Sequence, residues 1–541
     1  MNPSWLESAV FYQIYPQSFC DSNGDGIGDL PGIISKLDYL QALGVNAIWI
    51  NPCFESPFQD AGYDISDYYR IAPRYGTNAD ARQLFLAARN RGFHVLLDLV
   101  PGHTSNAHPW FQASCKHQPN EYSDWYVWTD SGWTWEIPGL RLINGYGERD
   151  ACYAANFFYF QPALNYGFAD LDPRYPWQQS VDAPGPQTVR RKLREIMEFW
   201  LAMGCSGFRV DMAASLVKND PGWRETTNLW REIRAWLDRD YPEAVLVSEW
   251  SHPAAAIQAG FHGDFLLPFA SAGYASLFRK SGPGGAGSDP YGFSFFDPAG
   301  HGNIRQFLDE YESLYQEIKG RGLICLTTGN HDITPRLGTA RTTDDLELSF
   351  LFLLSMPGAP FIYYGDEIGM RTLEGLASKE GGLSRTGSRT PMQWTGGPAA
   401  GFSSAAVEKL YLPIDPAPGF PNVALQESDP HSLLQRVRRM IALRRAHPAL
   451  WATGDFQTVY GESGKYPLVF RRSASGETLL VGLNPAHDPV SVRFPQPFTG
   501  ERSMEIHTLY GIQQGLTVES DGLRLSLPGI SGGVYCLGRE K

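Results

Sequence analysis

The strongest constraint on the fold is a repeated alternation of short apolar runs with longer amphipathic stretches. Eight runs of strand length recur, and the segments between them space apolar residues three or four positions apart, as helices do. This alternation builds a parallel sheet wrapped by helices, so we expect an α/β fold in which eight units close into one (β/α)8 barrel. The expected strands are residues 9–15, 47–51, 94–100, 207–212, 244–249, 264–269, 323–328 and 360–364.

The alternation is interrupted once and then stops. Residues 103–171 are rich in Trp, Tyr, Asn and Gly and show little helical period, which predicts an inserted lobe over the mouth of the barrel. Beyond about residue 455, short alternating segments separated by Gly, Pro and Asp turns indicate an antiparallel β-sandwich. The predicted organisation is a barrel of residues 1–102 and 172–455, a lobe of residues 103–171 and a sandwich of residues 456–541.

Composition narrows the class of protein. The 541 residues carry a formal charge of −13 without any basic run, so neither nucleic acid nor a membrane surface is expected as a partner, and a neutral small molecule fits better. The 7 cysteines are scattered without metal-ligand or disulfide spacing, which favours a reducing compartment. Since no signal peptide or long apolar stretch is recognisable, we expect a cytoplasmic protein, of an oligomeric state that the sequence leaves open.

Three of the apolar segments lead directly to a carboxylate: Asp211, Glu249 and Asp332. Strand tips of a barrel aim such acids at one mouth, where barrel enzymes keep their chemistry. A single strand-end acid can also be only a helix cap or an ion-pair partner, but three together favour a site. Arg209, two residues before Asp211 on the same strand face, would hold a carboxylate ionised. Two carboxyls flanking a glycosidic bond suffice for its cleavage.

The segments that carry these acids resemble the signature regions of the α-amylase family, glycoside hydrolase family thirteen. The resemblance runs from FYQIYP (residues 11–16) through the final sandwich. It implies that Asp211 is the nucleophile, that Glu249 is the acid/base, and that Asp332 clamps sugar hydroxyls. It also implies that His103 and His331 donate hydrogen bonds to the glucose at the cleavage subsite.

Within the family, two segments resemble the oligo-1,6-glucosidase and α-glucosidase branch, which trehalose synthases share in part. They are GYDISDY (residues 62–68) and RTGSRTPMQW (residues 385–394). This resemblance implies that Asp64 and Arg389 form an ion pair that closes the pocket behind one terminal glucose, which makes the action exo. Tyr63 and Arg209 are expected to join them in binding substrate.

The loop of residues 21–29 places oxygen ligands at alternate positions with glycine at the sixth, as calcium-binding loops do. Its twelfth position is Gly32 rather than Glu, so it is no EF-hand. An Asx-rich turn without metal is the alternative. The family resemblance implies one structural Ca²⁺. Its expected ligands are Asp21, Asn23, Asp25, the carbonyl of Ile27, and Asp29.

Two positions depart from the family pattern. Gly102 stands where relatives usually carry an Asn that often ligates a second calcium ion, so no second calcium site is expected. Met212 follows the expected nucleophile, where relatives carry a Val or a small residue that tracks the preferred linkage. The sequence therefore leaves the linkage preference open.

Three functions are consistent with these residues. Our first expectation is a retaining exo-α-glucosidase that hydrolyses short α-linked glucosides by double displacement. The alternative is a transglucosidase or sugar isomerase of the same fold, trehalose-synthase-like or sucrose-using, which differs in how well water is excluded from the shared intermediate. The trehalose-synthase version is weakened because residues 248–252 read SEWSH where those enzymes usually read EANQW. A catalytically inactive transporter partner is disfavoured by the three retained acids.

Overall fold

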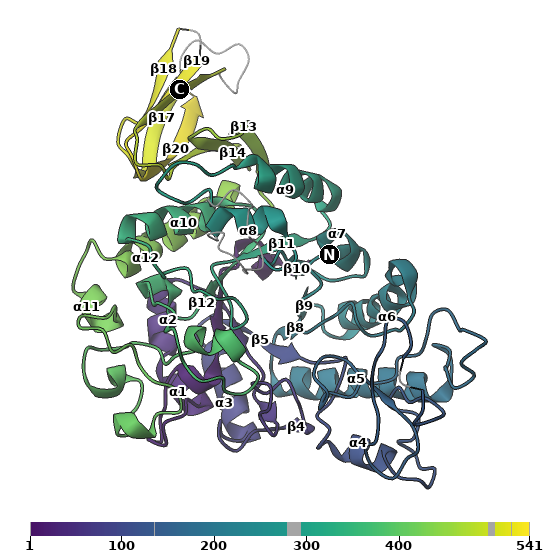
Figure 1. Cartoon of the computed structure of the whole chain (residues 1–541). Coiled ribbons are helices and arrows are strands. Elements are labelled where there is room, and N and C mark those ends of the chain that lie inside the picture. Colours follow the sequence, from purple (N-terminus) through teal and green to yellow (C-terminus); the bar gives the residue numbers. More distant parts are fainter. Residues whose placement is uncertain (1, 135, 279–293, 496–503, 521, 540–541) are drawn as a thin grey trace.

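The protein is described from a computed structural model that covers residues 2–134, 136–278, 294–495, 504–520 and 522–539 (Figure 1). The eight expected strands are confirmed, each within a few residues of its predicted bounds. They are β1 (Phe11–Ile14), β2 (Ala47–Ile50), β5 (His94–Leu99), β8 (Gly207–Val210), β9 (Val245–Ser248), β10 (Gly263–Phe265), β11 (Leu323–Thr327) and β12 (Ala359–Tyr363). All neighbouring pairs are parallel, and the strands close in the order β1-β12-β11-β10-β9-β8-β5-β2.

Helices surround this barrel and bury their apolar stripes against it. Capping boxes start two of them, because Thr77 and Thr342 each exchange hydrogen bonds with an Asp three residues later. The helices are α1 (Leu30–Ser35), α2 (Leu37–Leu43), α3 (Asn78–Arg89), α5 (Pro184–Met203), α6 (Arg224–Asp240), α7 (Pro253–Gln258), α8 (Ala272–Phe278), α9 (Arg305–Ile318), α10 (Thr343–Ser355), α11 (Val423–Glu427) and α12 (Leu433–Ala446).

The interior of the barrel is filled by side chains rather than open. Phe11 and Phe361 stack there with ring centroids 4.2 Å apart, and Phe265 packs edge-on against Phe361 at 4.6 Å. Trp49, 1% exposed, completes this cluster and also lies beneath the site described below. A solid barrel of this kind holds the strand ends, and any side chains on them, in fixed positions.

The chain between β5 and β8 leaves the barrel and forms a lobe with little regular structure. It contains α4 (Pro109–Ser114) and the pair β6 (Arg141–Ile143) and β7 (Tyr153–Ala155), and α4 lies at the lower right of Figure 1. Phe111 is the centre of its core, with Trp128 stacked on it at 5.7 Å and Tyr126 and Tyr153 edge-on at 5.0 Å. A second short hairpin, β3 (Phe54–Glu55) with β4 (Asp67–Ile71), precedes the lobe.

The C-terminal strands form two antiparallel sheets, β13-β14-β15-β20-β17 and β16-β19-β18, which share one apolar core. The expected sandwich is confirmed, and it projects from the top of Figure 1. Its strands are β13 (Asp455–Tyr460), β14 (Leu468–Ala474), β15 (Glu477–Asn484), β16 (Val490–Phe494), β17 (Met504–Gly511), β18 (Leu516–Glu519), β19 (Gly522–Leu527) and β20 (Ser531–Arg539).

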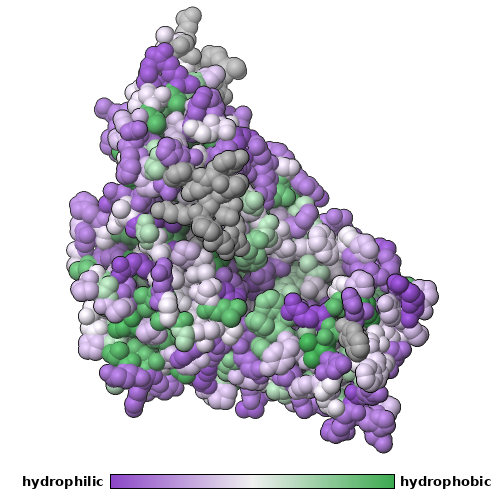
Figure 2. All heavy atoms as spheres, in the orientation of Figure 1, coloured by the Kyte–Doolittle hydropathy of each residue, from purple (hydrophilic) through white to green (hydrophobic). Residues whose placement is uncertain are grey.

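Two features bear on the environment of the chain. All seven cysteines are free, and six of them are buried. In the described ranges, no helix has both the length and the apolar character needed to span a bilayer. On the face shown in Figure 2, hydrophilic residues are interspersed with smaller hydrophobic groups, the clearest of which lies at the lower left.

A buried arginine joins the sandwich to the barrel. Arg472 on β14 is fully buried and donates hydrogen bonds to the carbonyl of Ser355, the last residue of α10. It also donates to the carbonyls of Trp451 at 2.7 Å and Gly454 at 3.2 Å. Its Nε also donates to the carbonyl of Asp455 at 3.2 Å, so one buried side chain binds four backbone carbonyls at the junction.

Replacing Arg472 with Met should therefore lower the free energy of unfolding by about 3 kcal/mol, because buried carbonyls lose their donors. Urea unfolding followed by circular dichroism measures this change. The control is Arg471→Met, the neighbouring and partly exposed position on the same strand, which should change stability by less than about 0.5 kcal/mol. Equal losses in the two variants would show that Arg472 does not join the domains.

Candidate active site

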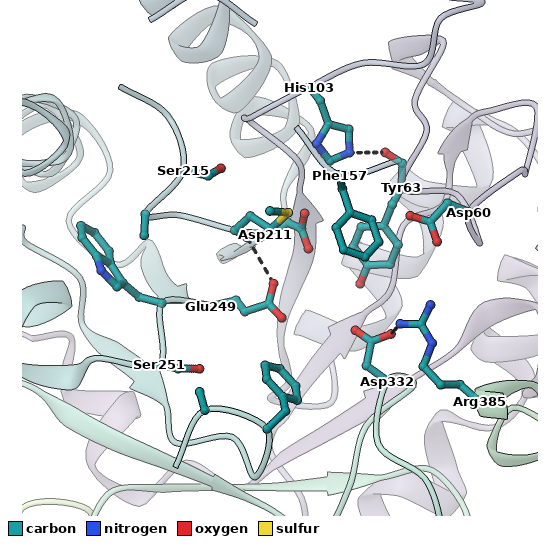
Figure 3. Close-up of a pocket in the computed structure, with 15 residues that line it drawn as sticks. Asp60, Tyr63, His103, Phe157, Asp211, Ser215, Glu249, Ser251, Asp332 and Arg385 are labelled. Carbon is teal, nitrogen blue, oxygen red and sulfur yellow. Dashed lines mark hydrogen bonds and ion pairs between the residues drawn. The ribbon is translucent and has the colours of Figure 1, made fainter. Parts of the chain in front are cut away.

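A pocket of ≈ 530 Å³ opens at the C-terminal ends of the barrel strands (Figure 3). Asp211 directly follows β8, Glu249 directly follows β9, and Asp332 lies in the loop after β11. All three predicted acids line the pocket, so the structure brings them together as expected. The other lining residues are Asp60, Tyr63, His103, Phe157, Met212, Ala214, Ser215, Trp250, Ser251, Phe269, Ala270 and Arg385.

The guanidinium of Arg209 holds three carboxylates beneath the pocket floor. Its Nη1 lies 2.8 Å from Asp98 Oδ1 and 2.9 Å from Asp211 Oδ1, and its Nη2 lies 2.9 Å from Glu249 Oε2. The side chain is 1% exposed, and its charge lies over the ring of Trp49 at 5.0 Å. Since Asp211 and Glu249 bind neighbouring nitrogens of one planar group, their carboxyls are held close together and in fixed orientation.

The same surroundings set the protonation of these two acids. Burial raises the pKa of Asp211 to about 7, against the attraction of Arg209, and the charge of Asp98 adds to the rise. Burial raises the pKa of Glu249 to about 8, again opposed by Arg209, with Asp211 adding repulsion. Two close carboxyls resist double ionisation, and the group with the higher pKa keeps the shared proton. Near neutral pH that group is Glu249.

Asp332 has the opposite character. Burial acts to raise its pKa, but His331, Arg385 and Arg389 outweigh burial and hold the pKa below the usual value. Arg385 forms a very short ion pair with Asp332 Oδ1, and Arg389 Nη2 lies 3.2 Å from the same oxygen. The pocket therefore presents one permanently ionised carboxylate opposite the pair that shares a proton.

The two predicted histidines are neutral hydrogen-bonding groups. Burial lowers the pKa of both His103 and His331 to about 3. The amide nitrogen of Asn51 lies 3.1 Å from His331 Nδ1, which makes Nδ1 the acceptor and leaves the proton on Nε2. His331 Nε2 in turn lies 2.7 Å from the hydroxyl of Tyr63, which donates to Asp98 at 2.9 Å. Asn51 and Asp98 are thus parts of the site that the sequence analysis missed.

The predicted ion pair between Asp64 and Arg389 is wrong. Asp64 is fully buried, and its carboxylate accepts hydrogen bonds from the backbone of Gln59 and Asp60 and from the hydroxyl of Ser56, all at 2.9–3.0 Å. It therefore shapes its own loop and does not reach the pocket. Arg389 lies behind the wall, where it pairs with Asp332 and donates to the carbonyl of His331 at 2.8 Å.

The residues that line the pocket are instead Asp60 and Arg385, each four positions before the predicted one. Asp60 accepts from the amide of Gln161 at 2.8 Å, and burial raises its pKa to about 7. Both segments offer two like-charged residues four positions apart. In each segment, the backbone conformation determines which of the two side chains faces the cavity. In the 60–64 loop this conformation includes a turn at Gly62, with φ +93°.

A lysine ammonium joins the lobe to the barrel beside His103. Lys218 Nζ donates to the carbonyl of Ser215 at 2.5 Å and to Asn156 Oδ1 at 3.2 Å, while Asn156 Nδ2 lies 3.2 Å from His103 Nδ1. A Cβ at Gly102 would lie 2.7 Å from Asn156 Nδ2, so a larger side chain there would displace the Asn156 amide from its contact with His103.

The loop of residues 21–29 folds as a series of Asx turns. Asn23 Oδ1 accepts from Asp25 N at 2.9 Å, and Asp25 Oδ1 accepts from Ile27 N at 2.8 Å. Asp21 binds three backbone N–H groups, and Asp29 caps α1 through Gly32 N at 2.6 Å. Across the described ranges, no three His, Cys, Asp or Glu side chains gather as a metal site. The expected calcium site also uses the amide of Asn23 and the carbonyl of Ile27, so this observation does not test it.

A closed barrel with two adjacent carboxyls at its mouth is the arrangement of enzymes that act on glycosidic bonds. Residues 13–453 match the family model "Alpha amylase, catalytic domain". The chain therefore belongs to the α-amylase family.

Three relatives place the chain within that family. It is 32% identical over 535 residues to the trehalose synthase/amylase TreS of Mycobacterium tuberculosis, covering 92% of this chain and 83% of TreS. It is 30% identical over 566 residues to the oligo-1,6-glucosidase of Parageobacillus thermoglucosidasius, covering 92% of this chain and 93% of the relative. The trehalulose synthase MutB, solved as a variant in complex with the substrate sucrose, superposes with a TM-score of 0.79 at 26% identity, over 99% of this chain and 100% of MutB.

The two acids of the 60–64 loop give a direct test of this geometry. Asp60→Asn should lower kcat/KM on disaccharides by about 100-fold or more at unchanged melting temperature, because remote contacts to the bound sugar supply energy used at the reacting carbon. Asp64→Asn should instead lower the free energy of unfolding by about 1–3 kcal/mol, since three buried donors lose a charged acceptor. Kinetics and thermal melts of both variants distinguish these roles. Loss of activity in Asp64→Asn, with only a loss of stability in Asp60→Asn, would show that Asp64 is the residue that contacts substrate.

Proposed function

We propose that this chain is a retaining α-glucosyl-transferring enzyme that converts one small α-glucoside into another, as a transglucosidase or sugar isomerase. The observation that carries the retaining mechanism is that Asp211 and Glu249 bind one guanidinium, at 2.9 Å each. Retaining enzymes need the two carboxyls about 5–5.5 Å apart, whereas inverting enzymes need room for a water between them.

The proposed first step cleaves the glycosidic bond. Glu249 gives its proton to the leaving oxygen while an oxygen of Asp211 attacks the anomeric carbon, which forms a β-linked glucosyl ester. The ionised Asp332 accepts hydrogen bonds from sugar hydroxyls and stabilises the positive charge that develops on the sugar ring. Burial keeps His103 and His331 neutral, so each carries a single ring N–H. The Nε2 of His103 lies 3.1 Å from the carbonyl of Tyr63 and that of His331 lies 2.7 Å from the hydroxyl of Tyr63, so either histidine donates to a sugar only by exchanging this partner for a substrate oxygen.

The proposed second step decides between transfer and hydrolysis. Glu249, now ionised, takes a proton from the acceptor hydroxyl, which attacks the ester and restores the α configuration. Apolar side chains also line the pocket: Met212, Ala214, Phe157, Phe269 and Ala270. Such walls favour a sugar acceptor over water.

The comparisons support transfer more than the exo-hydrolysis expected first. Trehalose synthases and sucrose-converting synthases are among the relatives, and they cover nearly the whole chain. The oligo-1,6-glucosidase of Parageobacillus thermoglucosidasius is 30% identical to this chain, and a probable α-glucosidase of Rhizobium meliloti is 31% identical. Hydrolysis by an α-glucosidase therefore stays the second candidate.

Product analysis separates the two candidates. The chain should be incubated with maltose, isomaltose, trehalose and sucrose in turn, and the products should be followed by NMR that resolves anomers. We expect most turnovers of the preferred substrate to yield an isomeric or longer α-glucoside rather than free glucose. Stoichiometric release of α-glucose from the start would favour the α-glucosidase, and β-glucose as first product would overturn the retaining mechanism.

One structural calcium ion in the 21–29 loop stays a prediction from the family resemblance. If the loop rearranges around an ion, excess EDTA should lower the melting temperature, and added CaCl₂ should restore it, while activity at room temperature stays largely intact. Differential scanning calorimetry measures this effect. A melting temperature unchanged by EDTA and CaCl₂ would show that the Asx turns alone hold the loop.

A further inference from the structure

A second cavity, of ≈ 370 Å³, lies in the inserted lobe. Its walls come from residues 123–130 and 176–179, with Arg149, Asn165 and Phe168. None of these residues lines the catalytic pocket. The volume falls within the range of about 300–1,000 Å³ that small-molecule sites occupy, at its lower end.

One wall offers an aromatic face. Trp177 is half-buried, and its ring is fixed edge-on against Phe168 with centroids 5.7 Å apart. Arg149 also lines the cavity, and its guanidinium lies over Trp128 at 4.8 Å and donates to the carbonyl of Ser123 at 2.7 Å. A rigid, partly exposed indole is a surface on which the C–H face of a pyranose ring can pack at little cost in side-chain entropy.

The edges of the cavity offer uncommitted polar groups. Gln178 Oε1 accepts from Asp172 N at 2.8 Å, and Gln179 Oε1 accepts from Asn165 at 3.3 Å, so both amide oxygens are fixed. In the described part of the chain, no hydrogen bond or ion pair engages the amide nitrogens of these two glutamines or the carboxylate of Asp130. Donors and acceptors thus surround one apolar face.

This mixture selects a neutral ligand. Asp124 and Asp130 carry two negative charges against the single positive charge of Arg149, so an anionic ligand such as a phosphate is disfavoured. Hydroxyl groups both donate and accept, and they can pair with amide nitrogens and a carboxylate along the same edge. A sugar offers such hydroxyls around an apolar face.

The cavity also adjoins the catalytic pocket through the backbone. Asn165 donates to the carbonyl of Asp124 at 3.0 Å, at the cavity wall. Two residues earlier, Ala163 forms a β-bridge with His103, which lines the catalytic pocket, and Leu164 N donates to the carbonyl of Gly102 at 3.0 Å. A sugar bound in the lobe would therefore lie on the same rigid element as the pocket wall.

We infer that the lobe cavity is an accessory binding site for a neutral sugar, holding one or two glucosyl units against Trp177. The site performs no chemistry, and its ligand class follows from its own side chains. The inference about this cavity does not depend on whether the reaction at the catalytic pocket is glucosyl transfer or hydrolysis.

Maltose binding to the full chain tests this site. Isothermal calorimetry is done on the Glu249→Gln variant, so that the ligand is not consumed. A maltose-binding site that depends on Trp177 is expected: adding Trp177→Ala should weaken it by about tenfold or more, the usual loss when an aromatic anchor is removed. In the otherwise unchanged chain, Trp177→Ala should leave kcat/KM on disaccharides within about twofold.

Two further variants complete the test. Trp133→Ala removes a more exposed tryptophan of the same lobe, 78% exposed and outside the cavity, and should leave maltose binding unchanged. Asp130→Ala should weaken the accessory site without disturbing the fold, which covers the case in which Trp177→Ala unfolds. Maltose binding that neither Trp177→Ala nor Asp130→Ala alters, or no binding beyond the catalytic pocket, would overturn the inference. Failure to transfer glucose would instead count only against the proposed function.

Discussion

The site depends on one buried cation. Arg209 lies within 2.9 Å of Asp98, Asp211 and Glu249, and no solvent reaches it to screen the three charges. Burial alone would favour the neutral form of every acid here, and the guanidinium opposes this for each of the three. Together, burial and the charge of Arg209 leave one proton shared by Asp211 and Glu249 near neutral pH. This state is the one that catalysis needs, because the nucleophile must be ionised while the acid beside it holds a proton.

The barrel makes that balance possible. Arg209 lies on β8, Asp211 directly follows β8, and Glu249 directly follows the adjacent strand β9. Val210 pairs with Ser248 in the parallel register of these strands, which fixes the relative height of the two acids. The packed aromatic interior, with Trp49 under the guanidinium, keeps the cation from shifting toward water. Asp332 lies on the loop after β11, where His331, Arg385 and Arg389 lower its pKa more than Arg209 does and keep it ionised.

Sequence patterns predicted the parts of this design that follow a regular period. Strands repeat apolar residues over a fixed length, so all eight strands and the two acids that directly follow β8 and β9 could be located. Asp332 was expected at a strand tip as well, but it lies in the loop beyond β11, which ends at Thr327. The periodic pattern gives no sign of the break at Lys36, where φ −108° and ψ 4° separate α1 from α2. Asp60 and Arg385 were missed because the orientation of loop side chains has no period. Asp98 was missed because its partner, Arg209, is distant in sequence.

The most direct test of the central claim is the configuration of sugar azides formed by two variants on a substrate with an activated leaving group. Asp211→Gly lacks the nucleophile, so azide should attack the substrate itself and give a β-glucosyl azide. Glu249→Ala still forms the glucosyl ester, so azide should attack from the other face and give an α-glucosyl azide. Reversed configurations, or near-parental activity of Asp211→Gly on natural disaccharides, would contradict the roles assigned to the two carboxyls on Arg209.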